Sequence, residues 1–164
     1  MTRVAVRKLS KIWRDKNISK HLKKRLVHCL IFPILMYGSE SWTMRQSEMK
    51  KIDATEMYCW RRMLRIPWTA RRTNESIIQE LNITERLSTS IQSRILKYFG
   101  HVMRRDTDCM EKLIIQGKVP GRRPRGRSPS RWIDQLSKIT HKPLHMLVHE
   151  AQDRELWRQT SHIT

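Results

Sequence analysis

The sequence predicts an all-α fold, and two observations support that prediction. Apolar residues recur at intervals of three and four along most of the 164 residues, whereas strict alternation of apolar and polar residues is scarce. Residue types that cap helices, such as Ser19 and Thr73, stand just before several of these periodic stretches. A hydrophobic fraction of 38% argues against a fully disordered chain.

Two helices are expected before residue 40. One side of the first is lined by apolar residues, namely Val6, Leu9, Ile12 and Trp13. Ser19 is placed to cap the second, whose leucines recur four apart at Leu22, Leu26 and Leu30. We expect Pro33 to kink this helix, because proline lacks a backbone N–H, and Gly38 to end it.

A third helix is expected between Thr43 and Pro67. Thr43 and Gln46 have the spacing of a capping box. Its last two turns separate by charge: Trp60, Met63 and Leu64 fall on one side, and Arg61, Arg62 and Arg65 on the other. Asp53 and Glu56 share the apolar side. A catalytic carboxylate pair is one interpretation, but buried partners for nearby arginines are favoured.

Five further helices are expected after Pro67. Thr73 can cap a short one through Ile77, Ile78 and Leu81. Thr84 can cap a longer one through Leu87, Ile91, Ile95, Tyr98 and Val102. Another starts at Asp108 and ends at Gly117, and Ser130 caps one that carries Trp132, Ile133, Leu136 and Ile139. The last is expected from about Pro143 to Arg158.

The net charge of +19 indicates a polyanionic partner. Residues 1–130 hold 29 Lys and Arg against 11 Asp and Glu, whereas residues 131–164 hold five against four. The cations therefore lie mainly before Trp132. We expect RNA or DNA as the partner, with an anionic membrane surface as a less favoured alternative.

The densest basic segment lies between Gly121 and Trp132. It contains Arg122, Arg123, Arg125, Arg127 and Arg131 and no acidic residue, while glycine and proline disfavour a helix. Guanidinium groups match phosphate oxygens in geometry, so we expect contact with a nucleic-acid backbone. A solvated basic loop is the alternative. No sequence-specific base reading is predicted.

Other cations form further candidate groups. A second group comprises Arg61, Arg62, Arg65, Arg71 and Arg72, with Trp68 placed to stack on an unpaired base. Arg104, Arg105 and Lys118 are additional candidates for phosphate contact. A third group comprises Arg3, Arg7, Lys8, Lys11, Lys23, Lys24 and Arg25. For this third group, a solvated helix face is an equal alternative.

Several kinds of site are not expected. Cys29, Cys59 and Cys109 form no CxxC pair, so a zinc ribbon is not supported, and three reduced thiols fit a nuclear or cytoplasmic protein that is not secreted. The N-terminus has no signal-peptide core, and the longest apolar run, residues 26–37, is too short to span a bilayer. The spacing of His141, His145 and His149 allows a zinc-ligand row, but Pro143 interrupts it, and we expect no metal site.

Six blocks occur in an order and spacing that resemble one family. They are residues 26–43, 52–74, 96–105, 117–118, the arginine-rich loop from 121 ending in 131–134, and 153–158, and the most specific reads IDATEMYCWRRMLRIPWTARRTN. Together they resemble the C-terminal end of the reverse transcriptase of LINE-type (non-LTR) retrotransposons, especially the RTE/BovB type. The resemblance extends over nearly the whole chain.

The resemblance implies a helical thumb-like bundle followed by a basic loop and C-terminal helices. It divides the chain into the end of the reverse-transcriptase region (1–42), a helical post-thumb domain (43–116), the arginine-rich loop (117–130) and C-terminal helices (131–164). The family carries an endonuclease and a polymerase that uses Mg²⁺ at paired aspartates. No Asp-Asp pair occurs here, so no catalytic residue and no cofactor is carried over, and we expect the chain alone to be inactive.

The function predicted from these features is nucleic-acid binding by a C-terminal reverse-transcriptase fragment. Such a fragment would contribute to template and primer binding, with RNA or DNA and the missing palm and fingers as partners. The alternative is a host-recruited protein–protein interaction module of retroelement origin. It would dock a partner through the apolar stretch around Phe32, Leu35 and Tyr37. The equal alternative for this stretch is the core of the isolated chain.

Overall fold

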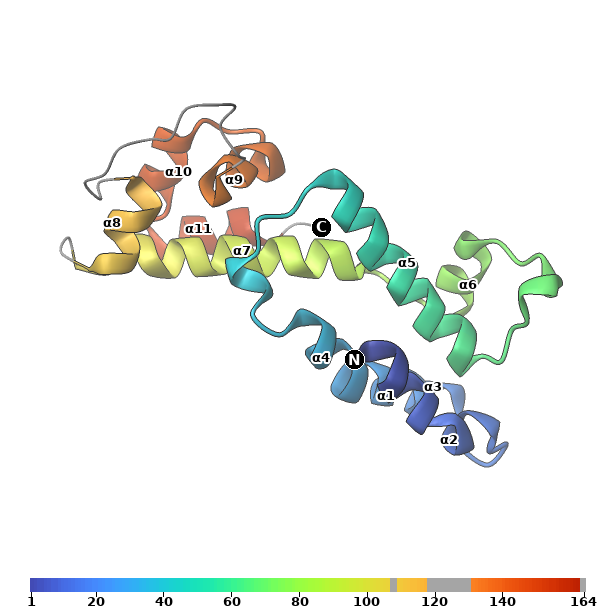
Figure 1. The fold of residues 1–164 in the computed structure, drawn as a ribbon. Helices are drawn as coiled ribbons and strands as arrows, with labels where there is room; N and C mark the ends of the chain where they lie inside the picture. The colour runs from blue at the N-terminus through green and yellow to red at the C-terminus, as the bar shows by residue number, and fades with distance from the viewer. Residues whose placement is uncertain (107–108, 118–130, 163–164) are drawn as a thin grey trace, which may run out of the picture. The chain divides into compact units, whose positions relative to one another are not determined.

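The computed structural model describes residues 1–106, 109–117 and 131–162, and its regular elements are all helical (Figure 1). No strand occurs in these residues, so the predicted all-α class is confirmed. The chain forms two compact units, which are described separately. Unit 1 contains Met1–Tyr37 and Gln46–Ser88, and unit 2 contains Gly38–Arg45 and Thr89–Thr164. The four-segment division stays a prediction.

Unit 1 begins with two short helices where one was expected. α1 (Thr2–Lys8) ends at Leu9, and α2 (Ser10–Arg14) follows directly. The Nε1 of Trp13 donates to the carbonyl oxygen of Val6 at 2.9 Å, and both side chains are buried. This tertiary contact requires the chain to bend between the two helices, which the apolar spacing alone does not reveal.

The second predicted helix also changes course, close to the predicted place. α3 (Lys20–Leu26) is capped by Ser19, whose Oγ accepts from the backbone N–H of Leu22 at 3.2 Å, as predicted. It continues into a π-helical turn, η1 (Val27–Ile31), and then α4 (Phe32–Met36). Pro33 cannot donate a helical hydrogen bond, which favours a change of register just before it. Gly38, at φ +66°, follows the end of α4.

The residues that this segment buries are not the leucines that the spacing predicted. Val27, Ile31 and Phe32 are buried, whereas Leu22 and Leu30 are 46% and 49% exposed. The π-turn inserts one residue per turn, so it shifts the inward face away from the leucines.

α5 (Gln46–Met63) separates by charge as predicted: Trp60 and Met63 are buried, and Arg62 and Arg65 are exposed. The helix begins at Gln46, later than the predicted cap at Thr43 implies. It ends in a Schellman motif, in which Ile66 N–H donates to Arg61 O at 2.9 Å and Arg65 adopts a left-handed φ of +58°.

A buried carboxylate joins distant parts of unit 1. Glu56 is 1% exposed, and it accepts hydrogen bonds from Trp60 Nε1 (3.2 Å), Arg86 Nε (2.8 Å) and the backbone N–H of Leu87 (3.3 Å). Asp53 Oδ1 lies 3.6 Å from Arg86 Nη2. The prediction of a buried arginine partner is therefore confirmed for Glu56, whereas Asp53 pairs with the same arginine but is one third exposed.

The same carboxylate binds the first residue of α7 (Leu87–Met103), which still belongs to unit 1. α7 begins at Leu87, three residues after the predicted cap at Thr84. The N–H of Leu87 is accepted by Glu56 from another helix, so a tertiary acceptor serves this helix start. Ile91 and Ile95 are fully buried, in agreement with the predicted apolar side.

α6 (Asn74–Glu80) completes unit 1, after a 3₁₀ turn η3 (Trp68–Ala70). Thr73 caps it as predicted, because its Oγ1 accepts from Ser76 N–H at 3.2 Å. Ile77 is buried. Asn82, at φ +47°, ends the segment with a second Schellman pattern, in which Ile83 N–H donates to Ile78 O at 3.0 Å.

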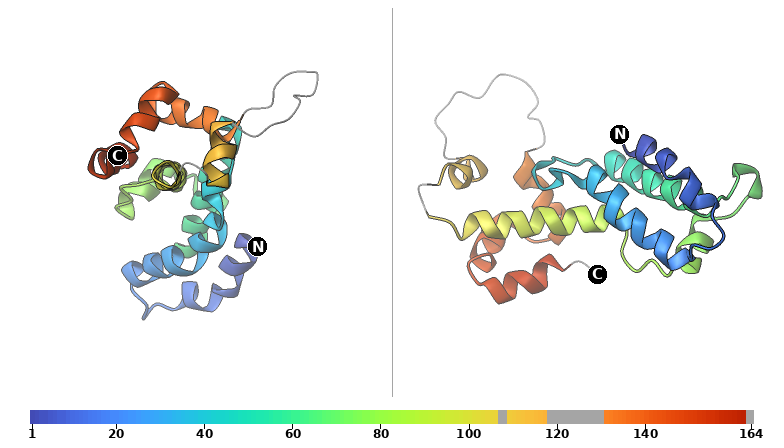
Figure 2. Two further views of the ribbon diagram at one scale, coloured as in Figure 1. Left: turned by 90° about the vertical axis from the view of Figure 1, so that its left-hand side faces the viewer. Right: turned by 90° about the horizontal axis from the view of Figure 1, so that it is seen from below.

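Unit 2 packs α11 (Arg154–Ser161) antiparallel to α7 (Figures 1 and 2). Ser93 Oγ donates to Ser161 O at 2.7 Å, and Trp157 Nε1 donates to Leu96 O at 3.0 Å. A Cβ on Gly100 would overlap Nε1 and Cδ1 of Trp157, so the indole fits only against glycine. Trp157 is consequently buried between the two helices.

The remaining helices of unit 2 are short. α8 (Met110–Gln116) ends at the left-handed Gly117, as predicted, while Asp108 lies outside the described residues. α9 (Trp132–Thr140) has Arg131 as its N-cap residue, not Ser130, which also lies outside them. The single predicted C-terminal helix is two, α10 (Leu144–Glu150) and α11, because Asp153 caps a new start by accepting from Glu155 and Leu156 N–H.

The segment Gly38–Arg45, with its 3₁₀ turn η2 (Ser39–Ser41), packs on α9 within unit 2. Trp132 Nε1 donates to Glu40 O at 3.0 Å. The side chain of Gln135 donates to Trp42 O at 2.8 Å and accepts from Met44 N–H at 3.0 Å. This pairing holds the backbone just before α5. Within the described ranges, no helix has the length and apolar character needed to cross a membrane.

Gly100→Ala tests the packing of Trp157. Helix propensity alone predicts a stabilisation of about 0.5–1 kcal/mol. The overlap with the indole predicts the opposite, a destabilisation of about 1–3 kcal/mol, because the ring must move within a packed core. Urea denaturation followed by circular dichroism measures the sign. In a Trp157→Ala background the cost should largely disappear, and a cost that persists there would contradict the packing explanation.

Glu56→Ala should destabilise the protein by about 3–5 kcal/mol, because it leaves Arg86, Trp60 Nε1 and Leu87 N–H without their buried acceptor. Asp53→Ala is the matched control. Asp53 is one third exposed and lies 3.6 Å from the same arginine, so its loss should cost about 1 kcal/mol or less. Equal losses in denaturation experiments would show that Glu56 has no special structural role.

Candidate functional site

A basic groove of about 790 Å³ lies in unit 1 between α1, α2 and the C-terminal end of α5. Its lining includes five arginines: Arg7, Arg14, Arg61, Arg62 and Arg65. Apolar lining comes from Val6, Trp13, Ile66 and Pro67. No aspartate or glutamate lines it. We call this feature the arginine groove.

Local structure places each arginine. The bend at Leu9 keeps Arg7 on α1 and Arg14 at the end of α2 along one side of the groove. Trp60 and Met63 bury the inner side of α5, which leaves the neighbouring arginines facing outward. The left-handed turn at Arg65 brings one more cation, together with Ile66 and Pro67, to the same groove.

The ring of Tyr58 lies close to two guanidinium groups. The Cζ atoms of Arg3 and Arg62 lie 5.5 and 5.6 Å from its ring centroid, within cation–π range. The attraction of the ring offsets part of the repulsion between the two cations. The Tyr58 hydroxyl is buried without a hydrogen-bond partner among the described residues.

The arginine groove concentrates uncompensated positive charge. Among the described residues, no carboxylate forms an ion pair with Arg7, Arg14, Arg62 or Arg65. Arg61 is held by neutral acceptors, since its Nη2 donates to Arg72 O (2.7 Å) and Asn74 Oδ1 (2.9 Å). Charged donors without an anionic partner favour binding of an anion from solution.

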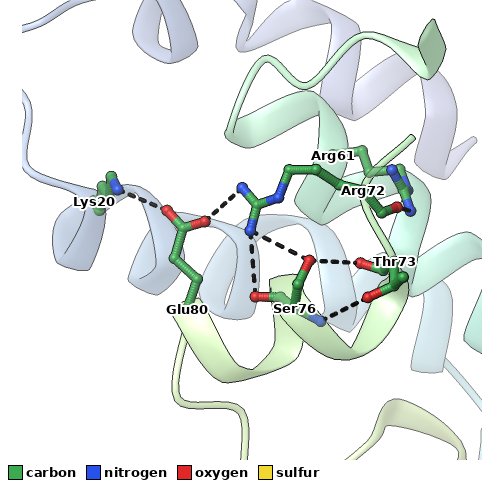
Figure 3. Close-up of polar contacts among 6 residues, drawn as sticks. All are labelled: Lys20, Arg61, Arg72, Thr73, Ser76 and Glu80. Carbon is green, nitrogen blue, oxygen red and sulfur yellow. Dashed lines mark hydrogen bonds and ion pairs between the residues drawn. The ribbon is translucent and has the colours of Figure 1, made fainter. Parts of the chain in front are cut away.

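Arg72, a predicted phosphate contact, forms an internal network (Figure 3). Its Nη1 lies 2.7 Å from Glu80 Oε2, and Lys20 Nζ lies 2.7 Å from Glu80 Oε1. Hydrogen bonds from Lys20 and then Arg72 hold the pKa of Glu80 below its usual value. Arg72 also donates to Ser76 O at 3.3 Å. Because its own carbonyl accepts from Arg61, Arg72 helps to orient a residue of the groove.

The other predicted residues are dispersed. Arg71 is exposed with a left-handed φ of +48°. In unit 2, Arg104 donates to Ala151 O at 2.8 Å, Arg105 pairs with Glu111 at 2.9 Å, and Arg131 lies 3.6 Å from Asp134. The side chain of Trp68 lies outside the described part of the structure, as do Lys118, Arg122, Arg123, Arg125 and Arg127. Of the predicted set, the groove therefore unites Arg61, Arg62 and Arg65.

Sequence reasoning missed one member of the groove and misjudged two lysines. Arg14 lies on α2, after the bend at Leu9, so the spacing of residues along one helix does not place it beside Arg7. Lys23 and Lys24 instead bind carbonyl oxygens at the C-terminal ends of α2 and α6. Lys23 Nζ donates to Trp13 O and Asp15 O, and Lys24 Nζ donates to Leu81 O and Asn82 O, at 2.7–3.2 Å.

Cys59 and the histidines do not form a reactive or metal-binding site in the part of the chain that the structure describes. Burial, with a contribution from Glu56, raises the pKa of Cys59 to about 12, so this thiol stays protonated at neutral pH. In the described residues, no three His, Cys, Asp or Glu side chains come together as metal ligands. His141 precedes α10 in a left-handed conformation, so it does not continue the helix that carries His145 and His149.

Comparison with known proteins gives a distant relative. No protein-family model matches the chain, and no solved structure is significantly similar. The chain is 27% identical over 133 residues to an uncharacterized transposon-derived protein of Caenorhabditis elegans, a match that covers 79% of this chain and 48% of the relative. The chain thus spans about half the length of the curated relative it matches. This similarity indicates an origin in a transposable element.

Proposed function

We propose that the chain is a nucleic-acid-binding fragment of a retrotransposon reverse transcriptase, of the LINE type. It binds RNA or DNA through the arginine groove and the arginine-rich loop (117–130), and it contributes to template and primer binding without catalytic residues of its own. The observation that carries this proposal is the groove itself, where five arginines meet without a lining carboxylate.

The chemistry of the groove favours a phosphodiester strand over a small anion. Guanidinium groups bind phosphate oxygens through paired hydrogen bonds, and several of them spread over about 790 Å³ suit a repeating polyanion. Ile66 and Pro67 add apolar surface beside the cations. The +19 net charge adds a long-range attraction that brings such a ligand to the chain.

The retroelement part of the proposal has separate support. The relative from Caenorhabditis elegans is transposon-derived, and the matched region covers most of this chain. The ordered blocks at residues 26–43, 52–74 and 96–105 supply the reverse-transcriptase resemblance. In that setting, binding to template and primer is the role that needs no catalytic residue.

One observation favours a second candidate, a protein-interaction module. Of the predicted apolar stretch, Phe32 is buried, so its part in docking was wrong, whereas Tyr37 is 86% exposed. Leu30 and Ile34, which recur along the same α3–α4 segment, are 49% and 44% exposed. Exposed apolar side chains at helical spacing are typical of docking surfaces. A protein partner that survives nuclease treatment and high salt, and that is lost on Ile34→Ser, would favour this role over the first.

Replacing Arg7, Arg14 and Arg62 by glutamine tests the groove. Three phosphate contacts contribute about 2 to the slope of log K against log salt on a single strand, so affinity at 0.1 M salt should fall about 100-fold. Fluorescence anisotropy with a 40-nucleotide RNA measures both quantities. The matched control replaces the exposed Lys16, Lys50 and Lys51 by glutamine. These substitutions remove the same charge at positions outside the groove. Equal losses of affinity in the two variants would show that net charge alone explains the effect, and would contradict a binding site in the groove.

Arg65→Gly separates binding from stability. Arg65 and Asn82 both have left-handed φ values in Schellman motifs, so glycine at either position should stabilise the fold by roughly 1 kcal/mol. Only Arg65 lines the groove, and its loss removes one phosphate contact, about a 5-fold weakening at 0.1 M salt. Thermal denaturation and RNA anisotropy report the two effects. Weakening by Asn82→Gly as well would argue against a specific contact by Arg65.

A further inference from the structure

A second basic hollow, of about 600 Å³, lies inside unit 2 between α7 and α11. Its cationic lining comprises Lys97, Arg104, Arg154 and Arg158, and Glu155 is the single carboxylate that lines it. We propose that this hollow is a second phosphate-binding surface for a nucleic-acid strand. The inference rests on the proposed function, because it assigns another site to the same polyanionic ligand.

Two packed helices hold the cations in place. On α11, Arg154 and Arg158 are four residues apart and face the same side. On α7, Lys97 stands seven residues before Arg104, which directly follows the helix. Trp157 forms the buried floor, fixed by its hydrogen bond to Leu96 O and its fit against Gly100. The spacing of the four cations is therefore set by a packed interface.

Three of the four acidic residues in segment 131–164 bind groups outside the hollow, and the fourth, Glu155, is the carboxylate that lines it. Glu150 accepts from Lys142 Nζ at 2.6 and 2.8 Å, and Asp153 accepts the first N–H groups of α11. Asp134 accepts from Arg131 N–H at 2.9 Å. Residues 131–164 are nearly neutral in composition, yet four cations and one carboxylate line the hollow, which gives it an excess of positive charge. The fold thus creates a basic surface that the net charge of the segment conceals.

The donors suit a phosphate backbone. Arg104 uses one Nη1 hydrogen bond on Ala151 O, and its remaining N–H groups are free to bind. Three guanidinium groups and one ammonium can share the oxygens of successive phosphates, an arrangement that needs no sequence reading. Two such surfaces on one chain also raise the apparent affinity for a long strand, because the second contact becomes intramolecular.

The test replaces Lys97, Arg154 and Arg158 by glutamine in the full chain. Arg104 is retained, because it also holds the C-terminal end of α10. With a 40-nucleotide RNA, the slope of log K against log salt should fall by about 2 and the affinity at 0.1 M salt by about 100-fold. The Lys16, Lys50 and Lys51 variant is again the charge-matched control, and thermal denaturation verifies that each variant folds. A hollow variant that behaves like this control overturns the inference.

Footprinting gives a second readout on the unaltered chain. RNA should protect Lys97 from an amine-reactive reagent, read by mass spectrometry, while the exposed Lys50 stays reactive. If Lys97 stays reactive and only the groove variant loses affinity, the inference fails and the proposed function stands. If Lys97 is protected and only the hollow variant loses affinity, the hollow stands and the groove is refuted. Protection by anionic vesicles or polyglutamate, but not by RNA, would also overturn the inference.

Discussion

The buried carboxylate of Glu56 is the constraint on which unit 1 depends. A charge removed from water costs several kcal/mol unless it is paired and hydrogen-bonded, so Glu56 requires its donors to come together. These donors come from α5 itself, from Arg86 and from the start of α7. Trp60, one of the donors, also packs its ring against His28 and Phe32, with centroids 5.4 and 5.3 Å apart. The rotation of α5 is thereby fixed.

That rotation accounts for the arginine groove. With Glu56 and Trp60 turned inward, helical geometry turns Arg61 and Arg62 outward, toward α1 and α2. The Schellman motif then carries Arg65 to the same side, at a left-handed φ that costs a non-glycine residue roughly 1–2 kcal/mol. Unfavourable backbone geometry that brings a further cation to an already basic groove is consistent with a binding role.

Local signals in the sequence were sufficient for part of the fold. The caps Ser19 and Thr73 and the buried side of α5 are determined within one or two turns, and they are as predicted. The starts of α5 and α7 were misplaced, because Gln135 and Glu56 accept N–H groups from residues 91 and 31 positions away. In the groove, Arg61, Arg62 and Arg65 could be predicted from helical periodicity. Arg14 joins them through the bend at Leu9, which depends on the Trp13–Val6 contact.

Composition alone does not predict the binding surfaces, because the fold determines which cations remain unpaired. The chain has 34 basic and 15 acidic residues, but binding depends on which cations keep an acidic neighbour. Glu56, Glu80 and Glu150 each pair with Lys or Arg inside a unit, and Lys23 and Lys24 bind backbone carbonyls. These contacts stabilise the helices. They also engage the carboxylates that could otherwise neutralise the basic surfaces. The cations left unpaired then gather in hollows, where a phosphate strand can replace the missing carboxylates.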